Sequence, residues 1–174
     1  MSVRLRLGSS NAALDAAFDP LVARVLAHRG ISTPGQVDYQ LKHLLPYHQL
    51  KGIGQAVGLL VDALQAQQHI VIVGDFDCDG ATSTSLAMLA LGAMGAHNVS
   101  YLVPNRFDFG YGLSPALVDY AQASPPDLIV TVDNGIASHA GVDRAHELGI
   151  KVLVTDHHLA ADTLPAADAI VNPN

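Results

Sequence analysis

The stretch from residue 70 to residue 80 constrains the fold of this chain most strongly. Four β-branched residues, Ile70–Val73, precede three alternating aspartates, Asp75, Asp77 and Asp79. An uninterrupted apolar run of this kind predicts a strand buried on both faces, as in a parallel sheet. If the backbone stays extended beyond the strand, the three carboxylates point the same way. Because adjacent carboxylates repel one another, the segment predicts a divalent-cation site.

Two other local structures would contain the same aspartates. An EF-hand calcium loop needs a preceding helix and a glutamate at its twelfth position, but a strand precedes this segment and Leu86 occupies that position. A solvated acidic turn without a ligand remains open from this motif alone.

Strand and helix patterns alternate through the rest of the chain. Helical spacing of apolar residues from Ile53 to Leu64 leads into the first strand, and we expect a buried helix from Ala81 to Met94 because that segment is rich in alanine and leucine. Further strands are expected at 99–103, 127–132, 151–155 and 169–171, and helices from 115 and over 137–148. Crossovers of this length predict an α/β fold with a doubly wound, mostly parallel sheet.

The first 50 residues differ from the rest and predict a short helical N-terminal appendage. Asp19 and Pro20 are an N-cap and a first helical residue, and Thr33 with Gln36 is a capping-box pair that begins a second short helix. We therefore expect an appendage over 1–50 and the main domain over 51–174.

Two later strands also end in potential ligands. Asp133 follows one of them, and Asp156, His157 and His158 follow the next. Since the carboxyl ends of parallel strands meet at one edge, we expect these groups to join the three earlier aspartates. Carboxylates with imidazole suit Mn²⁺ better than Mg²⁺, and so many acids predict two ions that share a carboxylate and activate water. Adjacent histidines point apart in an extended chain, whereas a turn can bring both to one site; we therefore assign His157 to the metal and His158 to the phosphate or leaving group.

Four residues are candidates for contacting a substrate phosphate. Ser83 lies in the first turns of the expected helix, where its hydroxyl either faces an anion or satisfies the helix start. Arg106 lies in a glycine-containing loop, although its spacing alone favours an ordinary loop. Asn134 and Gly135 directly follow the third strand.

Composition restricts the partners. The 174 residues carry nine lysines and arginines against sixteen acids, a formal charge of −7. A nucleic-acid interface without a basic run would depend on metal ions and a few local cations.

The single cysteine, Cys78, excludes a disulfide framework and a multi-thiolate zinc site, and no apolar run reaches membrane-spanning length. We expect a cytoplasmic protein that does not bind membranes.

Three motifs together resemble the DHH phosphoesterase superfamily: Gly74–Gly80, Val132–Gly135 and Asp156–His158. Residues 103–114 resemble the RecJ-type members of that superfamily. The resemblance implies an enzyme, dependent on Mn²⁺ or Mg²⁺, that removes nucleotides from the 5′ end of single-stranded DNA in recombination and repair. It suggests a single-strand-binding protein and a helicase as partners.

The same resemblance implies roles for individual residues. Asp77, Asp79, Asp133 and His157 match metal ligands, with Asp133 as the bridge, and Asp75 is expected to be a further ligand. Asp156 is expected to orient its neighbours.

The resemblance also leaves alternatives open. The superfamily has a fourth metal-binding motif and further domains that do not occur before Asn174, so we expect the DHH domain to be incomplete at its C-terminus. A metal-binding fragment without activity, and a phosphodiesterase or pyrophosphatase acting on small nucleotides, remain alternatives. A haloacid-dehalogenase-type phosphotransferase would use the Asp77–Gly80 segment through a phosphorylated aspartate, but it gives no reason for the later Asp-His-His triplet.

Overall fold

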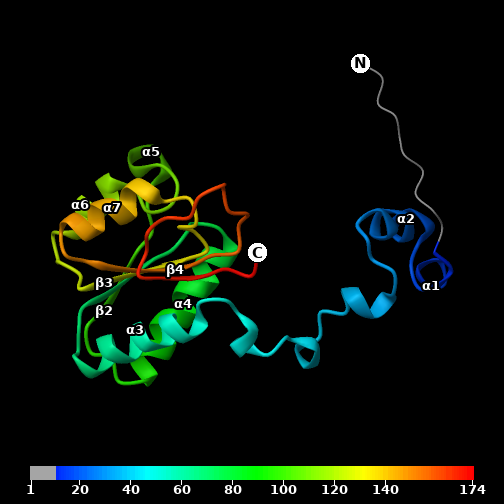
Figure 1. The fold of residues 1–174 in the computed structure, drawn as a ribbon, viewed down its shortest axis with the longest axis horizontal. Coiled ribbons are helices and arrows are strands. Elements are labelled where there is room, and N and C mark those ends of the chain that lie inside the picture. Colours follow the sequence, from blue (N-terminus) through cyan, green and yellow to red (C-terminus); the bar gives the residue numbers. More distant parts are fainter. Residues whose placement is uncertain (1–10) are drawn as a thin grey trace, which may run out of the picture. The chain divides into compact units, whose positions relative to one another are not determined.

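The computed structural model describes residues 11–174, which divide between residues 45 and 46 into two compact units (Figure 1). The described part of the first unit contains helices α1 (Ala12–Asp15) and α2 (Pro20–His28) and the 3₁₀ turns η1 (Pro34–Val37) and η2 (Leu41–His43). Asp19 caps α2 by accepting the Leu21 N–H. The capping box at Thr33 begins a single 3₁₀ turn, because the segment leaves helical geometry at Asp38.

A five-stranded parallel sheet forms the centre of the second unit. Its strands are β1 (Ile70–Val73), β2 (Val99–Leu102), β3 (Leu128–Val132), β4 (Lys151–Thr155) and β5 (Ala169–Val171). Their order is β2-β1-β3-β4-β5, and every neighbouring pair is parallel. The predicted α/β fold with a doubly wound parallel sheet is confirmed.

Helices cover both faces of the sheet (Figure 1). They are α3 (Ile53–Gln65) and α4 (Cys78–Ala93) on one face, and α6 (Pro115–Ala121) and α7 (His139–Glu147) on the other, with the short α5 (Arg106–Phe109) and the turn η3 (Tyr47–Gln49) in connecting segments. Alternate residues of each strand enter different layers. Ile70 and Ile72 pack in the core beneath α3 and α4, whereas Val71 and Val73 pack beneath α6 and α7. This alternation explains why all four residues of β1 are buried.

The strand order places a topological switch point between β1 and β3. From β1 the chain crosses to β2 on one side, and from β2 it returns past β1 to β3 on the other. Connections that diverge in this way leave a crevice at the carboxyl ends of the two strands, where open α/β sheets bind ligands. The segments that follow β1 and β3 begin at this crevice.

The expectation of a buried helix from Ala81 to Met94 was wrong in two respects. Helix α4 begins earlier, at Cys78, and only one side of it packs on the sheet. Leu86 and Leu89 are 68% and 74% exposed. The apolar residues of this helix show little periodicity. Composition alone therefore did not distinguish a helix that is buried on all sides from one that packs on the protein with one side only.

None of the helices within residues 11–174 has the length and hydrophobicity that crossing a bilayer requires.

Candidate metal centre

The aspartates after β1 lie at the start of α4. Asp77 is its N-cap, and its Oδ1 accepts the Gly80 N–H at 3.2 Å, which lowers the pKa of Asp77. Asp79 lies in the first turn of the helix. The backbone is therefore not extended beyond Asp77, and the condition under which all three carboxylates would point the same way is not met. Gly80 permits the tight turn, because a Cβ there would lie 2.4 Å from the Asp75 carbonyl oxygen.

Asp133 occupies the centre of the site, directly after β3. It is buried and has a φ of +64°, a left-handed conformation that a non-glycine residue adopts at a cost of about 1–3 kcal/mol. Its N–H donates to the Thr155 carbonyl at 3.0 Å, which holds it against the end of β4. Burial raises the pKa of Asp133, and the charges of Asp79 and Asp77 raise it further. A bound cation would favour the ionised carboxylate.

Asp133 belongs to two groups of potential metal ligands. Each group has ligand atoms within 4.8 Å of one another: Asp133 with His157 and His158, and Asp133 with Asp75 and Asp77. His157 Nε2 lies 2.8 Å from Asp133 Oδ1 and 3.7 Å from a carboxylate oxygen of Asp79. This donor set of carboxylate oxygens and imidazole nitrogens fits Mn²⁺.

Asp156 fixes the two histidines that follow β4. Its buried carboxylate accepts the N–H groups of His157 and His158 at 2.7 and 3.1 Å, and the Ile136 N–H at 2.9 Å. Burial opposes its ionisation, but these hydrogen bonds outweigh burial and lower the pKa of Asp156. The same carboxylate lies 2.7 Å from His158 Nδ1, and this hydrogen bond raises the pKa of His158. It also places the ring proton on Nδ1 and leaves Nε2 for another partner.

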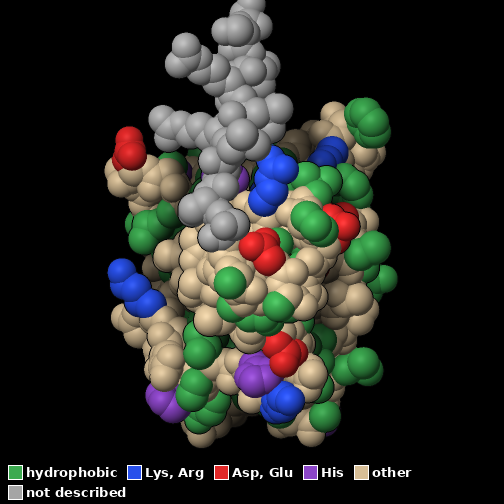
Figure 2. All heavy atoms as spheres, turned by 90° about the vertical axis from the view of Figure 1, so that its right-hand side faces the viewer, with side chains coloured by type: hydrophobic (Ala, Val, Ile, Leu, Met, Phe, Trp, Pro, Cys, Tyr) green, Lys and Arg blue, Asp and Glu red, His purple; other side chains and the backbone are tan. Residues whose placement is uncertain are grey.

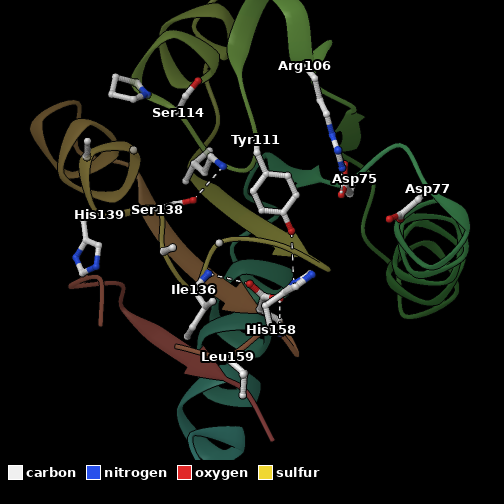
Figure 3. Close-up of a pocket in the computed structure, with 17 residues that line it drawn as sticks. Asp75, Asp77, Arg106, Tyr111, Ser114, Ile136, Ser138, His139, His158 and Leu159 are labelled. Carbon is white, nitrogen blue, oxygen red and sulfur yellow. Dashed lines mark hydrogen bonds and ion pairs between the residues drawn. The ribbon is translucent and has the colours of Figure 1, made fainter. Parts of the chain in front are cut away.

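A cavity of about 450 Å³ lies beside these residues (Figure 3). Its lining includes Asp75, Asp77, Arg106, Asp156 and His158. Two expected ligands from the end of β1, Asp75 and Asp77, therefore line the same cavity as Asp156 and His158 from the end of β4, whereas Asp79, Asp133 and His157 are not among its lining residues.

Arg106 lies at the cavity but is paired with Asp75. Its Nη2 is 2.9 and 3.2 Å from the two carboxylate oxygens of Asp75 (Figure 3). Its guanidinium carbon lies 3.7 Å from the Phe76 ring centroid. The ion pair fixes the Asp75 carboxylate, which still belongs to one of the two ligand groups. Asp75 as a ligand and Arg106 as a phosphate contact both remain predictions.

The other phosphate candidates separate into two kinds. Gly135 lines the cavity, with a φ of +111°, and a Cβ there would lie 2.4 Å from Thr131 Oγ1. Ser83 is not among the lining residues, and its hydroxyl donates to the Asp79 carbonyl one helical turn earlier. Asn134 is buried, and its amide donates to the carbonyls of Val73 and Val132, so it joins β1 to β3 instead of facing the cavity.

Tyr111 is a site residue that our sequence reasoning did not single out. Its hydroxyl donates to the Asp133 carbonyl at 3.3 Å. The same hydroxyl lies 3.5 Å from His158 Nδ1 (Figure 3). Burial and the surrounding carboxylates raise its pKa to about 12, so it remains a neutral phenol. The signal for it was its place between two glycines in the loop that carries Arg106.

Comparison with known proteins agrees with this geometry. A family model described as "DHH family, N-terminal domain" matches residues 69–174, which include all of β1 to β5 and the clustered acids. The chain belongs to the DHH family. The DHH motifs of the sequence are therefore the segments that the fold brings to one edge of the sheet.

Among curated DHH relatives, the single-stranded-DNA-specific exonuclease RecJ of Escherichia coli is 52% identical over all 174 residues. RecJ of Salmonella typhimurium is 54% identical over 172 residues. The chain spans 30% of the length of each.

Two solved structures share the DHH fold. A manganese-bound exonuclease RecJ is 39% identical, with a TM-score of 0.66 over 74% of this chain and 32% of its own. RecJ of Thermus thermophilus in complex with Mn²⁺ is 35% identical, with a TM-score of 0.64 over 93% of this chain and 22% of its own.

Proposed function

We propose that this DHH domain carries the metal centre of an exonuclease that hydrolyses single-stranded DNA from its 5′ end. The observation that carries the proposal is Asp133, the one carboxylate common to both ligand groups found in the described residues. The family match, and the names and bound Mn²⁺ of the RecJ relatives, support both the substrate and the metal.

The proposed metal ligands come from the segments that follow β1, β3 and β4. Asp77, Asp133 and His157 hold the metal ions, with Asp75 and Asp79 as further ligands. Two Mn²⁺ or Mg²⁺ ions, when bound, lower the pKa of a water nucleophile and offset the charge of the phosphate.

His158 is placed to act on the phosphodiester itself. Asp156 accepts its Nδ1 proton, so in the imidazolium form the second ring proton, on Nε2, can be donated to a phosphate or leaving-group oxygen in the cavity that His158 lines. The raised pKa of His158 favours that protonated form. Arg106, with Asp75 as its counter-ion, adds a guanidinium at the cavity wall for a phosphate oxygen.

The charge distribution is consistent with a DNA contact concentrated at the metal centre. On the face drawn in Figure 2, the lysine and arginine side chains in view lie singly among acidic and hydrophobic ones. The net charge of −7 would repel a phosphate backbone elsewhere. A single-strand-binding protein and a helicase as partners, and a cytoplasmic location, belong to this proposal.

The test incubates the chain with 5′-phosphorylated, 3′-labelled single-stranded DNA and Mn²⁺, with a duplex of the same sequence alongside, so that each nucleotide removed from the 5′ end shortens the labelled strand. Asp133→Asn is the test variant because it keeps the size of the bridging side chain and removes its charge. Asp143→Asn is the matched control: it removes the same charge from an exposed position on α7. Mn²⁺ binding is measured by calorimetry on all three proteins.

We expect stepwise release of nucleotides from single-stranded DNA by the parent chain and the control, and neither cleavage nor tight Mn²⁺ binding by Asp133→Asn. Cleavage that persists in Asp133→Asn would contradict the assignment of the centre. Mn²⁺ binding without cleavage by the parent would retain the metal centre and reject this chain alone as a nuclease.

A further inference from the structure

The His157–His158 dipeptide lies outside the sheet. It follows β4, and strand β4 ends at Thr155. Its backbone N–H and C=O groups therefore need partners other than the strand ladder. The two N–H groups donate to Asp156.

The two carbonyls of this dipeptide accept hydrogen bonds from asparagines beyond β5. Asn172 Nδ2 donates to the His158 carbonyl at 2.9 Å. Asn174 Nδ2 donates to the His157 carbonyl at 2.6 Å. The two asparagines are also joined to each other, because Asn172 Oδ1 accepts the Asn174 N–H at 2.9 Å.

The sequence is suited to this arrangement. Pro173 separates the asparagines, fixes its own φ and favours extended backbone at Asn172. Residues two apart in extended chain project to the same side, and here both carboxamides reach the same dipeptide. The preceding strand is docked at the same point, since the Asp156 N–H donates to the Val171 carbonyl at 3.1 Å.

We propose that Asn172 and Asn174 are positioning residues that hold the His157–His158 backbone, and with it the His157 ligand and the His158 ring, in the geometry of the metal centre. This inference rests on the proposed function for its purpose, but the clamp itself is a property of the chain without metal. Groups that orient metal ligands in this way change metal affinity by about 10–100-fold when they are removed.

The test compares Asn172→Ala with Asn98→Ala, which removes the same side chain from an exposed position just before β2, at the opposite end of the sheet. Two measurements are made at a temperature where circular dichroism shows each protein to be folded. The first is the Mn²⁺ dissociation constant by calorimetry. The second is the ring ¹⁵N spectrum of the histidines in metal-free protein, with His139 as an internal reference that lines the cavity without being clamped.

We expect Asn172→Ala to raise the Mn²⁺ dissociation constant about ten-fold or more. It should also shift the ring signals of His157 and His158 and leave those of His139 in place. Asn98→Ala should change neither measurement. A folded Asn172→Ala with parental Mn²⁺ affinity and unchanged histidine signals would overturn the proposal, even if its unfolding midpoint were lower, because that pattern describes a purely structural asparagine.

A second variant protects the test against misfolding. Asn174 is exposed, so Asn174→Ala removes the bond to the His157 carbonyl with little loss of packing. If Asn172→Ala does not fold, the same two measurements on Asn174→Ala decide the proposal by the same criteria. If the parent chain does not bind Mn²⁺, the proposed function fails, while the metal-free histidine spectra still decide whether the clamp exists.

Discussion

Replacing Asp156 by asparagine tests whether its carboxylate organises the loop after β4. Its Oδ1 accepts the N–H groups of His157 and His158 and lies 2.7 Å from His158 Nδ1, while its Oδ2 accepts the Ile136 N–H at 2.9 Å. A carboxamide has only one acceptor oxygen. If that oxygen continues to accept from the histidines, the amide NH₂ group of the asparagine points at the Ile136 N–H. Both groups are hydrogen-bond donors, so the buried Ile136 N–H loses its acceptor.

The expected cost follows from these contacts. A buried N–H left without a partner costs about 1–3 kcal/mol. The hydrogen bond to His158 loses its charge assistance, which removes about 1 kcal/mol more. We therefore expect Asp156→Asn to lower the free energy of unfolding by about 2–4 kcal/mol at pH 7.

Asp168 offers a matched control. It also accepts a backbone N–H and contacts a histidine, but it uses a single oxygen, Oδ2, for Val152 N–H at 2.8 Å and His146 Nε2 at 3.0 Å. Asparagine can keep both contacts through its one oxygen, and the site is partly exposed, so Asp168→Asn should cost less than about 1 kcal/mol. Urea unfolding followed by far-ultraviolet circular dichroism measures both variants. Equal losses in the two, or a loss under about 1 kcal/mol for Asp156→Asn, would refute the reasoning.

Three further outcomes are expected. Because the folded pKa of His158 is raised, its ion pair stabilises the fold fully below its unfolded pKa of about 6.5 and is lost as pH rises through the folded value. The difference in unfolding free energy between the parent and His158→Gln should therefore shrink as pH rises above about 6.5; a constant difference would contradict the pairing. Mn²⁺ at about 100 times its dissociation constant should stabilise the parent by about 2.7 kcal/mol, which raises its Tm by roughly 5–10 °C. EDTA should reverse this stabilisation. An equal rise in the Tm of Asp133→Asn would show that the ion binds at another site. Gly141→Ala should destabilise the fold by about 3 kcal/mol or more, since its Cβ would lie 1.9 Å from the Leu113 carbonyl oxygen. In the control Gly92→Ala, on α4, the added Cβ meets nothing within 4 Å, and this variant should be about 0.5–1 kcal/mol more stable than the parent. Thermal unfolding measures both, and similar Tm values for the two variants would refute the contact.

Features set by neighbouring residues could be predicted from the sequence. The N-cap at Asp19 and the helix start at Ser114 depend on side chains that reach only two or three residues along the chain. The strand at 151–155 has an apolar centre and was predicted with the bounds that the structure has, and residues 169–171 were predicted as the beginning of a strand, which in the structure ends at residue 171. The meeting of Asp133 with His157 followed from a rule of topology, because parallel strands end at one edge.

Features set by distant residues could not be predicted in this way. Asp75 is directed by an ion pair with Arg106, which lies 31 residues away, so its spacing with Asp77 did not give its orientation. Asn134 followed a strand end like the other candidates, but its amide bonds the Val73 carbonyl, 61 residues away. The orientation of Asp75 and the structural role of Asn134 depend on which charged side chains and buried backbone groups the fold brings beside them. The residues next to them in the sequence do not determine this.

Several residues of the proposed metal centre also stabilise the fold. Asp77 caps α4, and Asp156 satisfies backbone N–H groups from two loops, so substitution of either one weakens both the structure and the site. Asp79 differs, because its side chain is 67% exposed and lies near His157 without capping a helix. A loss of Mn²⁺ binding in Asp79→Asn at unchanged unfolding free energy can therefore be assigned to the metal centre itself, which a loss in Asp77→Asn or Asp156→Asn cannot.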